Sequence, residues 1–170
     1  MSTEKQAYQW LRFLLGIIVL FAGLLIYVMD RPLNQYPLLP ESLGIFHINL
    51  SLFTVFGNHF PTFCHVFSFI MMTAALYPAT RLSYLWVCGF WLFIDAMFEV
   101  GQHPAISQTI ISYIPDVFAD IPLLSNIPIY FESGRYDPFD MVSIILGVII
   151  AYGVLLMTEK RDHKTYDEKN

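Results

Sequence analysis

A short polar face interrupts the apolar segment 82–101 of this chain and continues just beyond it. Asp95 and Glu99 are four residues apart, and Gln102 follows three residues later, so a helix would place these side chains on one face. An ionisable side chain in an apolar environment must be paired, hydrogen-bonded or neutral. These residues therefore mark a candidate site, where carboxyl groups could bind a polar ligand or transfer protons.

Other polar side chains lie near the ends of further apolar segments. His65 follows the start of segment 61–77, and a group of charged residues opens segment 138–157. If these segments cross a membrane as helices, their polar ends meet at one depth. The sequence thus predicts one polar cluster contributed by three helices, made of His65, Asp95, Glu99, Gln102, His103, Arg135, Asp137 and Asp140.

Several members of this cluster also have a purely structural interpretation. Asp137 and Asp140 fit the N-cap and third positions of a helix. His65 could bond a backbone carbonyl, and Arg135 could lie among lipid headgroups or pair with an acid. Glu99 has no such simple explanation, and we expect it to pair with Arg135, to bond His65, or to be protonated.

The sequence contains no standard metal-ligand spacing and no nucleophile motif. The residue types that suit zinc are scattered along the chain: His59, Cys64, His65, Glu99 and His103. Ser68 lies three residues after His65, but no G-x-S-x-G elbow is present. We therefore expect neither a metal nor a cofactor.

The placement of charges predicts four membrane-spanning helices. The chain has 170 residues, of which 56% are apolar and 14% charged, and its net charge of −5 argues against nucleic acid as a partner. Each apolar segment is about as long as a bilayer is thick. We expect a single transmembrane domain over 1–158, with spans at 11–29, 61–77, 82–101 and 138–157, and a solvated or disordered polar tail at 159–170.

The basic residues orient the predicted spans. They gather on the two termini and on the short link 77–81, whereas only Arg31 and Arg135 fall in the two long loops. By the positive-inside rule, we expect both termini to face the cytoplasm. The expected location is the cytoplasmic membrane of a bacterium. Loops 31–60 and 103–137 then face outward, on the side of the polar cluster.

The two outer loops are unusually apolar. Residues 44–56 fit both an alternating strand and one face of a helix, and the second loop has the spacing of an amphipathic helix at Ile106, Ile110, Ile111 and Ile114. Such segments form a lid over the bundle or pack loosely at the membrane surface. The predicted fold is an all-α membrane protein, a four-transmembrane-helix bundle with two long extracytoplasmic loops carrying short interfacial helices or extended segments.

The ordered set of polar residues resembles the VanZ-like family of small bacterial membrane proteins. In that pattern a histidine opens one span, a later span carries E-x-x-Q, and G-R precedes an acid and a glycine of the last span. The matching residues, in chain order, are His65, Phe69, Glu99, Gln102, Gly134, Arg135, Asp137, Asp140 and Gly147. The connection 103–133 is longer than is usual in the family. The resemblance implies four or more spans and an outward-facing polar cluster, without an agreed reaction.

Three functions fit these observations. The favoured one is a non-catalytic accessory protein that binds an envelope lipid, or a lipid-linked or amphiphilic ligand. In this function Arg135 would contact a phosphate group of the ligand. Glu99 and His65 would hold the ligand in a pH-dependent way. The second is a structural subunit of a larger membrane complex. The third is an intramembrane hydrolase or transferase that uses His65 with Glu99 or Asp140. The expected partners are membrane lipids and either a membrane protein or a second copy of the chain.

Overall fold

A computed structural model describes residues 3–30, 56–121 and 124–167, and every regular element in these ranges is a helix. Four helices are long and apolar enough to cross a membrane, which confirms the predicted number of spans. They are α1 (Thr3–Asp30), α2 (Phe56–Leu76), α3 (Arg81–Gly101) and α6 (Pro138–Asp167). Their length and composition indicate a membrane protein.

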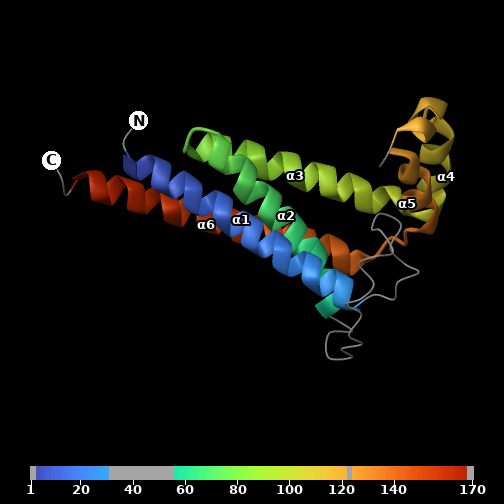
Figure 1. Cartoon of the computed structure of the whole chain (residues 1–170), viewed down its shortest axis with the longest axis horizontal. Coiled ribbons are helices and arrows are strands. Elements are labelled where there is room, and N and C mark those ends of the chain that lie inside the picture. The colour runs from blue at the N-terminus through green and yellow to red at the C-terminus, as the bar shows by residue number, and fades with distance from the viewer. Residues whose placement is uncertain (1–2, 31–55, 122–123, 168–170) are drawn as a thin grey trace.

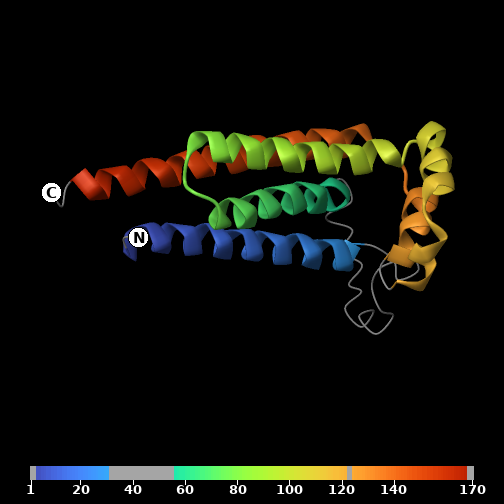
Figure 2. The same cartoon turned by 90° about the horizontal axis from the view of Figure 1, so that it is seen from above.

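The four long helices form a bundle in which α2 lies between α1 and α3 (Figures 1 and 2). Helix α6 packs along α2 and α3, and α1 packs mainly on α2. The two termini lie at the same end of the bundle (Figure 1). At the other end the chain forms short helices that cross the bundle, α4 (Pro104–Tyr113), η4 (Asp116–Asp120), η5 (Leu124–Asn126) and α5 (Ile127–Ser133). These short helices make up most of the described part of the second loop.

Local hydrogen bonds explain where three of the helices begin. The Thr80 hydroxyl accepts from the Ser83 backbone N–H at 3.1 Å and caps α3. His103 caps α4 in a similar way, with its Nδ1 accepting from the Ala105 backbone N–H at 3.3 Å. The Asp137 carboxylate accepts from the Phe139 N–H at 2.8 Å, so the predicted N-cap of the last span is confirmed.

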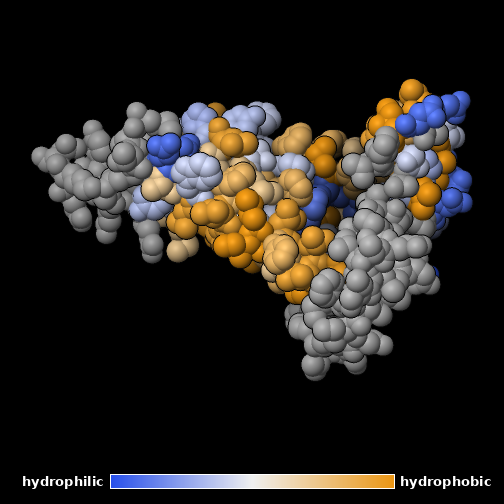
Figure 3. All heavy atoms as spheres, viewed as in Figure 1, coloured by the Kyte–Doolittle hydropathy of each residue, from blue (hydrophilic) through white to orange (hydrophobic). Residues whose placement is uncertain are grey.

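The core of the bundle is centred on α2. Val66, Ile70 and Met71 are fully buried there, against Tyr84 of α3 and Leu155 of α6. The outward faces of α1, α3 and α6 are also apolar, and their side chains are largely exposed. Trp86, for example, is 73% exposed. Figure 3 shows this apolar surface over the middle of the bundle. A soluble domain does not expose so much apolar surface, but a bundle surrounded by lipid does.

Glycines allow α1 and α6 to approach α2 closely. A Cβ added at Gly23 of α1 would lie 2.5 Å from the Cβ of Cys64, and one at Gly147 of α6 would collide with Val66. Gly153 differs, because a Cβ there would meet nothing within 4 Å. A close approach of two helices is therefore present at Gly23 and Gly147 and absent at Gly153.

Two helices extend beyond the expected spans. Helix α2 begins at Phe56, so Pro61 lies inside the helix and not in its first turn. Pro61 only removes the hydrogen bond to the carbonyl four residues earlier, a loss that a packed helix tolerates. Helix α6 continues to Asp167, so most of the polar tail is helical. Glu, Lys and Arg are good helix formers, and the preceding span supplies the nucleus. Residues 44–55 lie outside the described residues.

Candidate functional site

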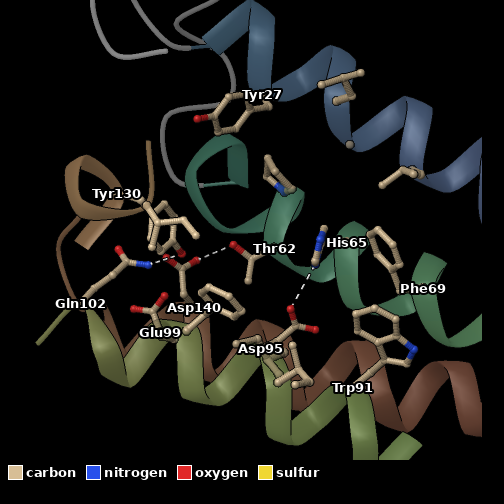
Figure 4. Close-up of a pocket in the computed structure, with 18 residues that line it drawn as sticks. Tyr27, Thr62, His65, Phe69, Trp91, Asp95, Glu99, Gln102, Tyr130 and Asp140 are labelled. Atoms are coloured by element: carbon tan, nitrogen blue, oxygen red, sulfur yellow. Dashed lines mark hydrogen bonds and ion pairs between the residues drawn. The ribbon is translucent and has the colours of Figure 1, made fainter. Parts of the chain in front are cut away.

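A pocket of about 730 Å³ lies between α1 and α3, with residues of α2, α5 and α6 completing its lining. It is partly open to the side of the bundle, near the end that is opposite the termini. Figure 4 shows its lining, and in Figure 3 hydrophilic atoms are visible in a recess beside α3, between apolar surfaces. Most members of the predicted polar cluster line this pocket: His65, Asp95, Glu99, Gln102 and Asp140.

Glu99 and Asp140 bring α3, α2 and the start of α6 together at the polar end of the pocket. Glu99 is only 7% exposed, and its Oε1 accepts a hydrogen bond from the Asp137 backbone N–H at 2.7 Å. The Asp140 Oδ1 accepts from the Thr62 hydroxyl at 3.1 Å and lies 3.0 Å from His59 Nδ1. Each carboxylate is therefore held by a group on a different helix or turn.

His65 and Asp95 form a second contact, one turn deeper in the bundle. His65 Nδ1 lies 3.2 Å from Asp95 Oδ1, and Figure 4 shows the two side chains pointing toward each other. The other oxygen of Asp95 is buried without a hydrogen-bond partner among the described residues. Beside this pair the His65 ring contacts Phe69, which in turn contacts Trp91. Asp95 thus has an unused acceptor next to an aromatic wall.

Gln102 and Tyr130 connect the pocket to the crossing helix α5. Gln102 Nε2 donates to the Tyr130 hydroxyl oxygen at 2.6 Å. Burial, with a smaller contribution from the nearby Glu99 carboxylate, raises the pKa of Tyr130 to about 12. The phenol therefore stays protonated at neutral pH and can both donate and accept a hydrogen bond.

The remainder of the pocket is apolar. Leu20 and Leu24 of α1 line one side, Trp91 and Phe98 of α3 line the other, and Ile144 comes from α6. These residues lie within the helices that are long enough to span a membrane. One pocket therefore combines an apolar wall at the depth of the spans with a group of carboxylates at one end.

Three residues of the predicted cluster do not line the pocket: His103, Arg135 and Asp137. Asp137 contributes its backbone N–H to Glu99, while its side chain caps α6. His103 is exposed and caps α4. Arg135 is exposed, and no ion pair joins it to an acid in the described part of the chain. The expected Glu99 partners, Arg135 and His65, are therefore replaced by a backbone N–H.

The residues of zinc-binding type are not brought together as one set. Cys64 packs against Gly23 of α1, and His65 pairs with Asp95. A different set lies close together, because ligand atoms of His59, Asp137 and Asp140 are all within 4.8 Å of one another. These atoms already hydrogen-bond within the protein, so the contacts are explained as helix capping and interhelical bonding.

Sequence reasoning missed several residues of the site. Thr62 and Tyr130 hydrogen-bond members of the polar cluster, and His59 contacts Asp140. A signal for two of them was present, because His59, Thr62 and His65 follow each other at intervals of three and share one face of α2. With the span expected to start at Pro61, His59 fell outside the helix, so the shared face was not recognised. Tyr130 has no such signal, since its position depends on how the second loop folds.

No protein family, characterised protein or solved structure in the comparisons matches this chain. The site can bind through its carboxylates, its amide and its phenol, and it can hold an apolar group along its aliphatic and aromatic wall.

Proposed function

We propose that this chain is a VanZ-like protein of the bacterial cytoplasmic membrane that binds an amphiphilic envelope molecule in the pocket between α1 and α3. Its role is that of a non-catalytic accessory protein. Both termini face the cytoplasm, and the polar end of the pocket faces the outer leaflet. The candidate ligands are an envelope lipid, a lipid-linked intermediate and an amphiphilic drug.

The observation that carries the proposal is the division of one pocket into two chemically different parts. Asp95, Glu99 and Asp140 line one end, whereas Leu24 and Trp91 belong to the apolar wall. An amphiphile has the same division, with a polar group joined to an apolar chain. A site that matches both parts selects such a molecule over a purely apolar lipid tail or a purely polar solute.

An intramembrane hydrolase is the second candidate, because the His65–Asp95 pair at 3.2 Å has the geometry of a base and its orienting acid. Ser68, the hydroxyl considered from the sequence, is buried and does not line the pocket, and the Thr62 hydroxyl in the pocket donates to Asp140. Within the described residues the pair therefore has no assigned nucleophile, so we favour binding over catalysis.

Native mass spectrometry of the protein, purified in a mild detergent, tests the proposal. We expect the wild-type protein to retain an amphiphile and Glu99→Gln to lose most of it. Asp116→Asn is the control and should retain the amphiphile fully, because the Asp116 carboxyl is exposed on η4 and lies outside the pocket. Retention that is equal in all three proteins would refute a ligand site at the pocket. A stoichiometric protein partner, with no lipid that depends on Glu99, would instead support the role of a complex subunit.

A further inference from the structure

We infer that the polar group of the amphiphile is a cation, an ammonium group held by Asp95 and Glu99. This inference rests on the proposed function, because it names the chemical class of the ligand for the same pocket. It differs from the expectation that Arg135 contacts a phosphate.

The charges around the pocket are the first support. Asp95, Glu99 and Asp140 all line it, and no Lys or Arg is among its described lining residues. His65 is the only lining group there that can become positive, and it already contacts Asp95. A phosphate in this position would meet several carboxylates without a permanent positive partner, which is unfavourable in a medium of low dielectric constant. An ammonium group would be attracted by the same carboxylates.

The unused hydrogen-bonding capacity is the second support. Asp140 already has Thr62 and His59 as partners. Asp95 retains a buried oxygen that lacks a partner among the described residues, and Glu99 is bonded through one of its two oxygens to a backbone N–H. A carboxylate has about four acceptor positions. The two acids of α3 line the pocket and retain acceptor positions that no described group occupies, as an ammonium donor requires.

The aromatic wall is the third support. Trp91 precedes Asp95 by four residues and so lies one turn away on the same face of α3, and Phe98 lines the pocket on the adjoining turn. Phe69 of α2 packs against Trp91, with ring centroids 4.7 Å apart. Aromatic faces attract ammonium groups, with tryptophan the strongest, whereas they offer a phosphate nothing comparable. Carboxylates and aromatic rings therefore point to the same ligand charge.

The fluorescence of Trp91 can report on this pocket directly. The other two tryptophans, Trp10 and Trp86, are exposed on the outer surface of the spans, so Trp10→Phe and Trp86→Phe leave one emitter in the site. The probes are amphiphiles that share one brominated alkyl chain and carry a primary ammonium, phosphocholine, hydroxyl or phosphate head group. Bromine quenches tryptophan on contact, and saturable quenching separates binding from linear partitioning into the detergent micelle.

We expect saturable quenching that is tightest for the primary ammonium. In Asp95→Asn and Glu99→Gln this affinity falls about 10- to 100-fold, the value of a hydrogen bond or contact to a charged group. Both variants keep the side-chain shape and an acceptor oxygen, and the thermal midpoint of each confirms folding. Asp116→Asn, on exposed η4, is the matched control and leaves the affinity unchanged.

The possible failures are distinguishable. Non-saturable quenching with every head group would overturn the proposed function and the inference with it. Saturable quenching with equal affinity for all head groups, or with a preference for phosphate that Arg135→Ala removes, would overturn the cationic ligand alone. Unchanged affinity for the primary ammonium in Asp95→Asn and Glu99→Gln would also overturn it.

Discussion

Replacing Gly23 with alanine tests the close approach of α1 and α2 that forms one side of the pocket. The new Cβ would lie 2.5 Å from the Cβ of Cys64, where ordinary contact begins at 3.4 Å. Neither Cβ can rotate away, because each is fixed to its backbone. The two helices must therefore separate by about 1 Å, and such overpacking costs about 1–3 kcal/mol.

Gly153→Ala is the matched control for this substitution. Alanine is better than glycine in a helix by about 1 kcal/mol, and this gain applies to both positions. A Cβ at Gly153 meets nothing within 4 Å, so only the gain remains there. We expect Gly153→Ala to stabilise the fold by up to about 1 kcal/mol. Gly23→Ala should then fall about 1–3 kcal/mol below Gly153→Ala in free energy of unfolding.

Unfolding by sodium dodecyl sulphate in mixed micelles, followed by circular dichroism, measures this difference. Adding Cys64→Gly to Gly23→Ala removes the opposing Cβ, so the two substitutions should be strongly non-additive. Equal stabilisation by Gly23→Ala and Gly153→Ala would refute the close packing of α1 on α2. Simple additivity with Cys64→Gly would refute the assigned contact.

Two further predictions concern groups away from the Gly23 contact. Arg12 is 1% exposed, donates to the Thr158 hydroxyl at 2.9 Å and lies 5.2 Å from the Tyr84 ring centroid. A double-mutant cycle of Arg12→Met and Tyr84→Leu should therefore give a coupling free energy of about 1–2 kcal/mol. A coupling of zero would refute the cation–π contact. Because the pKa of Tyr130 is raised from 10.0 to about 12, its contribution to stability is complete below pH 10 and is lost as the pH rises toward 12. The stability difference between wild type and Tyr130→Phe should therefore shrink over that interval, and a difference independent of pH would contradict the assignment.

The sequence was sufficient for the number and approximate position of the spans. Four long apolar segments bounded by charges can form little else in a membrane, so this part of the fold follows from composition and length. The N-cap at Asp137 was predictable for the same reason, because it depends on residues that are adjacent in the chain.

The partners within the site could be predicted only in part. Helical spacing correctly placed Asp95, Glu99 and Gln102 on one face of α3, and all three line the pocket. It could not say which side chain of another helix each one would meet, because the rotation of each helix is set by packing, here by the close contact at Gly147. Arg135 was expected to pair with an acid on the basis of charge alone, but the chain carries it to the exposed side of the turn before α6.

The lateral position of the pocket changes what a binding constant means for this protein. The pocket lies between α1 and α3, so the amphiphile that we propose as its ligand would be a component of the bilayer and would compete with the surrounding lipids. Its occupancy then follows the mole fraction of the ligand in the membrane, not its concentration in water. An amphiphile that partitions strongly into the bilayer is already concentrated there, and the protein needs only a modest preference for its head group to remain occupied. For such a ligand the head group would set the selectivity, while the membrane itself would supply most of the apparent affinity.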